Sequence, residues 1–227
     1  RGGSTKEEGT VSMDIEGRRE ARVCVFIIHS DCMKSKNILF LMGTYPSYGG
    51  VEIVSTTLAN QFIEDGHQVT IASYKQPLNE ATRLNLSDQC NLLFLSYPVL
   101  SIKNIKKLRE YILSHQIEVL INQWVVPFYA TLVWKWATYG TNCKVYSVHH
   151  NPPDTNMRIQ SLKRQIESGK GYLKGVYDLV REVSRLSLAF CIKNSHQFIL
   201  LSPSFITIAQ KFSRVKLPTK FLAIPNP

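Results

Sequence analysis

Short apolar runs alternate with amphipathic stretches along most of this chain. The first apolar run covers residues 38–42 and leads into the glycine-bearing segment 43–50. In the stretch that follows, four apolar residues share one helical face: Val51, Val54, Leu58 and Phe62. This succession predicts a buried strand, a loop and the start of a helix.

The same alternation continues to the end of the chain. Further strands are predicted at residues 69–71, 91–96, 119–121, 144–148, 197–201 and 221–224. Helices are predicted at residues 102–115, 127–139 and 206–212. Parallel strands need crossover connections and are buried on both faces. The pattern therefore predicts an α/β fold, a Rossmann-like parallel sheet with helices on both faces.

Residues 154–185 interrupt this rhythm with a basic, amphipathic segment. Cations outnumber acids there, and five apolar residues are predicted to share one helical face: Leu173, Val176, Tyr177, Val180 and Val183. Two interpretations stay open. The segment either lies on an anionic membrane surface through residues 158–185 or packs on the core with a solvated basic face.

Ligands of parallel α/β sheets gather beyond the carboxyl ends of the strands. The segments predicted to line that edge are 43–50, 122–124, 149–151 and 202–204. Gly49 and Gly50 leave backbone N–H groups unshielded at a helix N-terminus, where a diphosphate can bind. A tightly packed turn is an equally good reason for the pair. Neither a G-x-G-x-x-G fingerprint nor a Gly-Lys-Ser/Thr loop is present, so both of those phosphate-binding motifs are disfavoured.

Composition narrows the class of protein. A chain of 227 residues with 44% hydrophobic residues suits one α/β domain or two small ones, and a net charge of +10 indicates anionic partners. Dispersed cations without a recognition-helix pattern argue against nucleic acid. The five cysteines form no C-x-x-C pair, which favours a reducing cytosol and no metal site. No apolar run approaches the ~20 residues of a membrane span, and no export signal is evident.

Residues 1–32 differ from the rest. This stretch is largely polar, and Ile15–Arg18 resembles a protease recognition sequence used in recombinant proteins. Met33 looks like a natural start ahead of the first strand. We therefore expect a non-native or disordered leader at 1–32 and a domain at 33–227.

Six segments occur along the chain in a specific order: Tyr48–Glu52, Leu58–Asn60, Gly66–Ile71, His150–Pro152, Leu200–Ser204 and Ile224–Pro227. Together they resemble the N-terminal half of family-4 glycosyltransferases with the GT-B fold, and the resemblance covers residues 37–227. It implies a two-domain enzyme that transfers a sugar from a nucleotide-sugar donor to a hydroxyl of a glycan or lipid-linked acceptor. Retention at the anomeric carbon, no metal and no other cofactor are also implied.

The resemblance further implies that this chain is the acceptor-side half, that the C-terminal donor-binding domain is absent, and that the fragment alone is inactive. The implied location is the cytoplasm, at the inner face of the membrane. Two alternatives stay open: a nucleotide-sugar epimerase on the same scaffold, and a non-catalytic stand-alone binding module. The sugar, the acceptor and the oligomeric state are left undetermined.

The resemblance also suggests site residues. It places Gly49 and Gly50 near the donor pyrophosphate, and His150 near the donor sugar with His149 as its competitor for that role. The other expected substrate-binding residues are Glu52, Asn122, Trp124, Asn151, Ser202 and Ser204.

Structural roles compete for several of these residues. Glu52 suits the first turn of a helix, Ser202 suits a helix cap, and a pair of histidines is more often structural than catalytic. Adjacent strand residues point to opposite faces, which makes His149 and His150 a poor metal site. His67 is expected to fix a turn. Trp134 and Trp136 are expected in the core, which leaves Trp124 alone at the edge.

Overall fold

The structure is a computed structural model that describes residues 35–47, 49–76 and 85–224. The predicted leader at 1–32 lies outside the described residues, as do Tyr48 and the closing residues 225–227.

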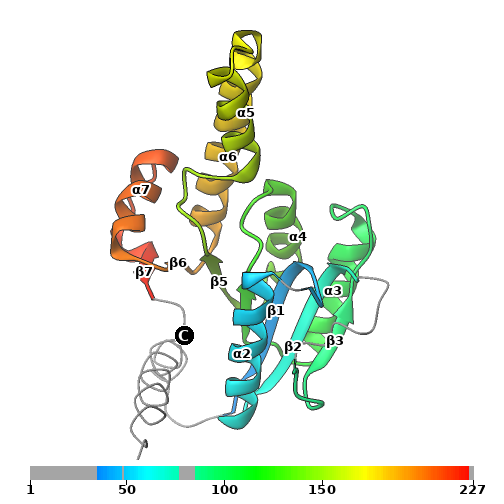
Figure 1. Ribbon diagram of the computed structural model, residues 1–227. Coiled ribbons are helices and arrows are strands. Elements are labelled where there is room, and N and C mark those ends of the chain that lie inside the picture. Colours follow the sequence, from blue (N-terminus) through cyan, green and yellow to red (C-terminus); the bar gives the residue numbers. More distant parts are fainter. Residues whose placement is uncertain (1–34, 48, 77–84, 225–227) are drawn as a thin grey trace, which may run out of the picture.

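The described strands form one parallel, seven-stranded sheet (Figure 1). Its order is β3-β2-β1-β4-β5-β6-β7. The strands are β1 (Asn37–Thr44), β2 (Gln68–Lys75), β3 (Asn91–Phe94), β4 (Val119–Asn122), β5 (Lys144–His149), β6 (Gln197–Leu200) and β7 (Phe221–Ala223). Leu39 of β1 pairs with Thr70 on one side and with Leu120 on the other. The predicted Rossmann-like parallel sheet is confirmed.

Helices cover both faces of the sheet, because alternate residues of the strands are apolar on both sides. Ile38, Phe40 and Met42 of β1 pack in one cluster with residues of α2 (Gly50–Glu64). Leu39 and Leu41 pack on the opposite side with residues of α3 (Ile102–Ser114), α4 (Phe128–Thr138), α6 (Lys174–Asn194) and α7 (Pro203–Ser213). Two short 3₁₀ helices, η2 (Gly171–Leu173) and η3 (Pro218–Lys220), complete the described elements together with α5 (Met157–Glu167).

The helix ends follow local chemistry. Gly66 has φ +85° directly after the C-cap of α2, a conformation that glycine adopts without the cost that a side chain would bring. Ser202 accepts a hydrogen bond from the Ser204 amide at 3.3 Å and so caps α7. His67 Nδ1 accepts from the Lys36 amide at 3.2 Å, which ties α2–β2 to the start of β1. The cap at Ser202 and the turn role of His67 are confirmed.

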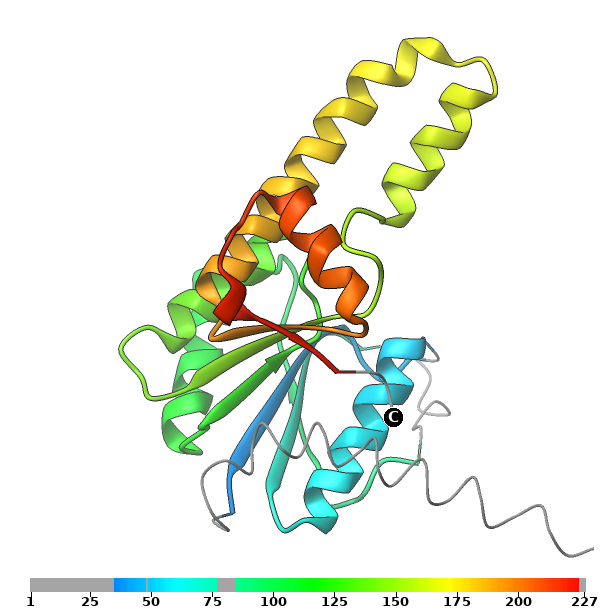
Figure 2. The same ribbon diagram turned by 90° about the vertical axis from the view of Figure 1, so that its left-hand side faces the viewer.

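Residues 154–185 belong to a helical hairpin that stands away from the sheet (Figures 1 and 2). Its first helix, α5, packs along the outer half of α6, and the base is tied by a hydrogen bond of 3.0 Å from Asn156 Nδ2 to Ser184 Oγ. The inner half of α6 lies on the sheet, where Leu188 and Ile192 are buried.

The five apolar residues predicted to share one helical face do not share one environment. Leu173, Tyr177 and Val180 are half-buried, whereas Val176 and Val183 are exposed. The exposed pair belongs to a separate stripe that we call the outer stripe, which consists of Tyr172, Val176, Leu179, Val183 and Leu186. None of the helices in the described ranges has the length and apolar character that a membrane span needs.

Candidate functional site

The strand order reverses between β1 and β4, which is where parallel α/β sheets place their ligands. From this point α2 lies on one face of the sheet and α4 on the other, so the two connecting loops diverge (Figure 1). Gly43 and Trp124 meet here. A Cβ atom added at Gly43 would lie 3.0 Å from Cδ2 and Cε2 of the Trp124 indole, so the ring is packed directly against the β1 backbone.

Trp124 is held from several sides. Its ring centroid lies 5.7 Å from that of Tyr74 and 6.0 Å from that of Tyr129, and its backbone amide donates to Asn122 Oδ1 at 3.1 Å. The ring is half-buried at the carboxyl edge of β4. Part of the Trp124 side chain is therefore still accessible from the edge.

Asn122 lies deeper than a ligand would reach. Its side chain is fully buried, and Nδ2 donates to Ser147 Oγ at 3.1 Å and to Cys191 Sγ at 3.8 Å. Since both ends of the amide are bonded to protein, the structure gives Asn122 the task of supporting the Trp124 loop.

The N-terminus of α2 opens toward the same edge. Gly49 is the N-cap, and no side chain among the described residues caps it. Apart from its chain neighbours and the adjoining backbone of α2, no described atom lies within 4 Å of the position that a Cβ would take at Gly50, so its backbone can be approached closely. The first-turn N–H groups and the helix dipole favour an anion at such a terminus.

Glu52 folds back over this terminus. A Cβ added at Gly49 would collide with the Glu52 carboxylate, which therefore lies against the N-cap residue. An acid in the first helical turn is favourable to the dipole. The structure is consistent with the structural role considered for Glu52.

His150 forms the shortest polar contact of the edge. Its Nε2 lies 2.6 Å from Gln123 Oε1, so the imidazole donates there and Nδ1 is left as an acceptor. Burial lowers the pKa of His150 from its usual 6.5 to about 4, which keeps the ring neutral at pH 7. Gln123 is itself buried, and its Nε2 has no hydrogen-bond partner among the described residues. This pair therefore offers one acceptor and one unused donor.

His149 faces away from this pair. It aligns with Leu200 of β6, and its ring lies 6.3 Å from Phe198, on the side of the sheet covered by α6 and α7. Burial, and secondarily the neighbouring His150, lowers the pKa of His149 to about 4. The described residues contain no cluster of His, Cys, Asp or Glu that could hold a metal ion.

The remaining predicted residues lie farther along the edge. Asn151 is exposed on the loop after β5. Ser202 and Ser204 share a hydrogen bond of 2.8 Å between their hydroxyls at the start of α7, one strand beyond. The structure thus brings the predicted residues of the β1, β4 and β5 loops onto three neighbouring strands, with the β6 serines next to them.

Sequence reasoning did not single out Gly43 or Gln123. Gly43 matters because of Trp124, which is 81 positions away, and only the pairing of β1 with β4 reveals that contact. Gln123 directly follows a buried strand, in a segment that was predicted to line the edge. That position is the one sequence feature that could have identified it as a candidate site residue.

The other two tryptophans differ in burial. Trp134 is 1% exposed, which confirms its predicted place in the core. Trp136 is 56% exposed beside Tyr139, so the core prediction for it was wrong. The 11 residues of α4 are mostly apolar, so the sequence did not show which side of this helix faces solvent.

Comparison with known proteins yields a family match and a set of structures with the same fold. The sequence profile described as Glycosyltransferase Family 4 matches residues 48–227. No curated protein is similar enough in sequence to count as a match.

Three solved structures show the shared fold. The lipopolysaccharide outer core galactosyltransferase WaaB in its apo form has a TM-score of 0.54 at 10% identity, over 84% of this chain and 46% of its own. A glycosyltransferase from Rickettsia africae has a TM-score of 0.52 at 15% identity, over 85% and 43%. Anabaena Alr3699/HepE, in complex with UDP and glucose, has a TM-score of 0.54 at 12% identity, over 84% and 44%. This chain therefore spans less than half the length of each of these structures.

Proposed function

Because the chain belongs to glycosyltransferase family 4, we propose that it is the acceptor-side half of an enzyme that transfers a sugar from a nucleotide-sugar donor to a hydroxyl of a glycan or lipid-linked acceptor. The observation that carries the proposal is the placement of the open Gly50 backbone and the His150–Gln123 pair on the loops next to the point of strand reversal. A nucleoside diphosphate donor is chosen because the Anabaena protein of the same fold was solved with UDP and glucose.

The proposed reaction is a displacement at the anomeric carbon. The acceptor oxygen bonds to that carbon on the face from which the diphosphate departs, the bond from the carbon to the diphosphate breaks, and the acceptor proton passes to the departing diphosphate. Retention of configuration and independence from a bound metal are parts of the proposal. Backbone N–H groups at the start of α2 are suited to stabilise the charge that develops on the diphosphate once the Glu52 carboxylate has turned away from Gly49.

The histidine is given a hydrogen-bonding task. Because the Nε2–H group of His150 donates its hydrogen bond to Gln123, Nδ1 of the neutral ring accepts a hydrogen bond from a hydroxyl of the sugar or of the acceptor. The unused Nε2 donor of Gln123 contacts a neighbouring oxygen of the same ligand. Trp124 supplies an aromatic surface for the sugar ring.

The test is transfer by the full-length protein with a panel of radiolabelled nucleotide sugars and both lipid and glycan acceptors. We expect label in the acceptor fraction, a retained anomeric configuration by NMR, and full activity in EDTA. Replacement of the candidate histidine, H150A, should lower kcat/KM roughly 10–100-fold. The control H115A alters an exposed histidine stacked on Tyr111 and should leave activity unchanged.

Other outcomes identify the alternatives. If an epimerised nucleotide sugar forms in the absence of an acceptor, the enzyme is an epimerase and not a transferase. Donor binding without any turnover would support the binding module. If H150A transfers label to the acceptor at the wild-type rate, the role given to that histidine is refuted.

The proposal includes work at an anionic membrane surface on the cytoplasmic side, through residues 158–185. The outer stripe is exposed along the hairpin, and residues 157–186 carry seven Lys or Arg against three Asp or Glu. An apolar stripe flanked by cations suits the interface of an anionic bilayer.

Vesicle pelleting tests this part. We expect sedimentation with phosphatidylglycerol vesicles, weaker sedimentation at high salt, and loss in the double variant L179Q/V183Q. The control L113Q removes an equally exposed leucine of α3 and should sediment like the wild type. Equal recovery in the supernatant with and without anionic lipid would refute the membrane proposal.

A further inference from the structure

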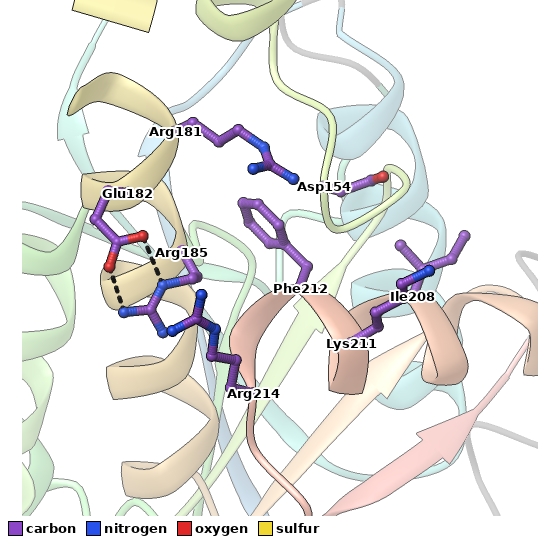
Figure 3. Close-up of a pocket in the computed structure, with 8 residues that line it drawn as sticks. All are labelled: Asp154, Arg181, Glu182, Arg185, Ile208, Lys211, Phe212 and Arg214. Carbon is purple, nitrogen blue, oxygen red and sulfur yellow. Dashed lines mark hydrogen bonds and ion pairs between the residues drawn. The ribbon is translucent and has the colours of Figure 1, made fainter. Parts of the chain in front are cut away.

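A basic pocket of about 440 Å³ lies between α6, α7 and the loop after β5 (Figure 3). Two of its cations come from α6 and two from the end of α7: Arg181, Arg185, Lys211 and Arg214. Two carboxylates and two apolar side chains complete the lining: Asp154, Glu182, Ile208 and Phe212. The pocket lies outside the candidate site, but the loop that supplies Asp154 also carries His150.

Positive charge in this pocket exceeds what the protein neutralises. Arg185 is paired with Glu182, with Nε to Oε2 at 2.8 Å and Nη2 to Oε1 at 2.5 Å. Within the described ranges no carboxylate lies at ion-pair distance from the three other cations, Arg181, Lys211 and Arg214. The pKa of Glu182 is lowered, first by the hydrogen bond from Arg185 and then by the charges of Arg185, Arg214 and Arg181. The Glu182 carboxylate therefore faces three guanidinium groups, and the lining as a whole has four cations against two carboxylates.

Two of the guanidinium groups are positioned in advance of any ligand. Arg181 lies over the ring of the buried Phe212, 5.6 Å from its centroid. The side chain of Arg185 is only 16% exposed and is oriented by its two bonds to Glu182. Groups that are already ordered lose little conformational freedom when an anion arrives.

Arg214 is held in an unfavourable backbone conformation. It follows α7 with φ 60° and ψ 22°, the left-handed region in which helices usually end on glycine. A residue with a Cβ gives up roughly 1 kcal/mol there. The arginine side chain brings a third guanidinium to the pocket at a position where glycine would serve the fold better.

We propose that this pocket is an anion-binding site for the phosphate or diphosphate group of a phosphorylated ligand. Arginine forks match the geometry of phosphate oxygens and bind them through charge-assisted hydrogen bonds. The volume exceeds that of a single phosphate, and the wall formed by Ile208 and Phe212 accommodates an apolar or sugar part next to it. The group comes either from an anionic lipid headgroup or from a soluble phosphorylated molecule.

Calorimetric titration of the chain with pyrophosphate tests the site. The variant R214G removes a guanidinium and at the same time relieves the left-handed residue, so it should fold at least as stably as the wild type. We expect R214G and R181Q each to weaken the Kd for pyrophosphate at least tenfold. The control K106Q removes an exposed cation of α3 and should keep the Kd within twofold.

Pyrophosphate also suits the N-terminus of α2, and the variants separate the two places. Binding that R214G and R181Q leave unchanged would overturn the proposal, as would the absence of binding to a folded wild-type chain. Neither readout involves sugar transfer, so a failure here is distinct from a failure of the proposed enzymatic function.

Vesicles distinguish the two sources of the phosphate group. If a lipid headgroup enters the pocket, R214G weakens binding to phosphatidylglycerol vesicles at least threefold more than K106Q does, and pyrophosphate competes with the vesicles. If the ligand is soluble, R214G binds the vesicles like K106Q while its affinity for pyrophosphate falls. Both results support the anion site and differ only in what supplies the group.

Discussion

Two glycines on the connection from β1 to α2 are subject to different constraints. At Gly43 the indole of Trp124 occupies the space beside the backbone, whereas the space beside Gly50 is free of described atoms. The first glycine is thus required by packing between the end of β1 and the loop after β4, and the second is free of that requirement. A pair of substitutions can separate these reasons.

We expect G43A to lower the free energy of unfolding by about 1–3 kcal/mol, because the added methyl group must displace the Trp124 ring. G50A should change it by less than about 0.5 kcal/mol, since alanine suits the first turn of a helix and meets no atom there. Urea denaturation followed by circular dichroism measures both. Equal losses in the two variants would show that Gly43 is not a packing position.

Two neutral imidazoles make stability depend on pH. His149 and His150 have pKa values lowered to about 4 by burial, while an unfolded histidine titrates near 6.5. Between these values the unfolded chain binds more protons than the folded one. Stability is therefore complete above pH 6.5 and is lost as the pH falls toward 4, by on the order of 2 kcal/mol per histidine.

Replacing one histidine should reduce this dependence. We expect the unfolding free energy of H150Q to fall less than that of the wild type between pH 7 and 4, with urea midpoints as the measurement. Carboxylates contribute alike to both proteins, so the difference isolates the imidazole. The control H115Q should follow the wild-type slope, and a parallel slope for H150Q would contradict a lowered pKa at His150.

At the scale of elements, the sequence predicted strands and helices well because their signals are local. Apolar runs, the stop at Gly66 and the cap at Ser202 each act within a few residues. The hairpin was harder, because helical periodicity shows which residues share a face without showing what covers it. The outer half of α6 packs against α5, and no local signal in α6 indicates that partner.

The same limit applied to the candidate site. The edge segments could be placed from the order of the strands, and His150 from its family motif. Its partner Gln123 lies 27 residues away, directly after the neighbouring strand β4, and that contact depends on the register of β4 and β5. Contacts of this kind follow from the assembled sheet.

A single asparagine joins β3 to α3. Asn104 is 1% exposed, and its Nδ2 donates to the carbonyls of Ser96, Pro98 and Val99 at 2.7, 3.1 and 2.8 Å. Its Oδ1 accepts from the Ser96 amide at 3.0 Å. This one side chain therefore satisfies four backbone groups of the connecting loop.

We expect N104A to lower the free energy of unfolding by about 2–4 kcal/mol, because it leaves four backbone groups, one buried and three part-buried, without these partners. N104D keeps the acceptor but loses the donors, so it should lose a comparable amount at pH 7. N151A, at an exposed asparagine, serves as the control in the same urea titration and should stay within about 0.5 kcal/mol. A result for N104A that matches the control would refute the bridging role.

At the scale of the whole molecule, one sheet supports two surfaces. The carboxyl edge carries the candidate site, while the α5–α6 hairpin rises beyond the body with its outer stripe and excess of cations (Figure 2). The inner half of α6 belongs to the core, so the hairpin is continuous with the fold. In the outer part of the hairpin, α5, η2 and α6 pack mainly against one another.

That arrangement predicts that the outer hairpin can be removed without loss of the sheet. Asn156 and Ser184 are already joined by a hydrogen bond of 3.0 Å, so a short glycine-serine linker in place of residues 157–183 closes a gap that is small in the folded chain. We expect cooperative unfolding with a loss below about 2 kcal/mol, mainly from Ile159, the buried residue of α5. Binding to phosphatidylglycerol vesicles should fall at least tenfold, because the outer stripe and most of the hairpin cations leave together. A chain that no longer folds would show that the hairpin is part of the core. Unchanged vesicle binding would show that the membrane-facing surface lies outside the hairpin.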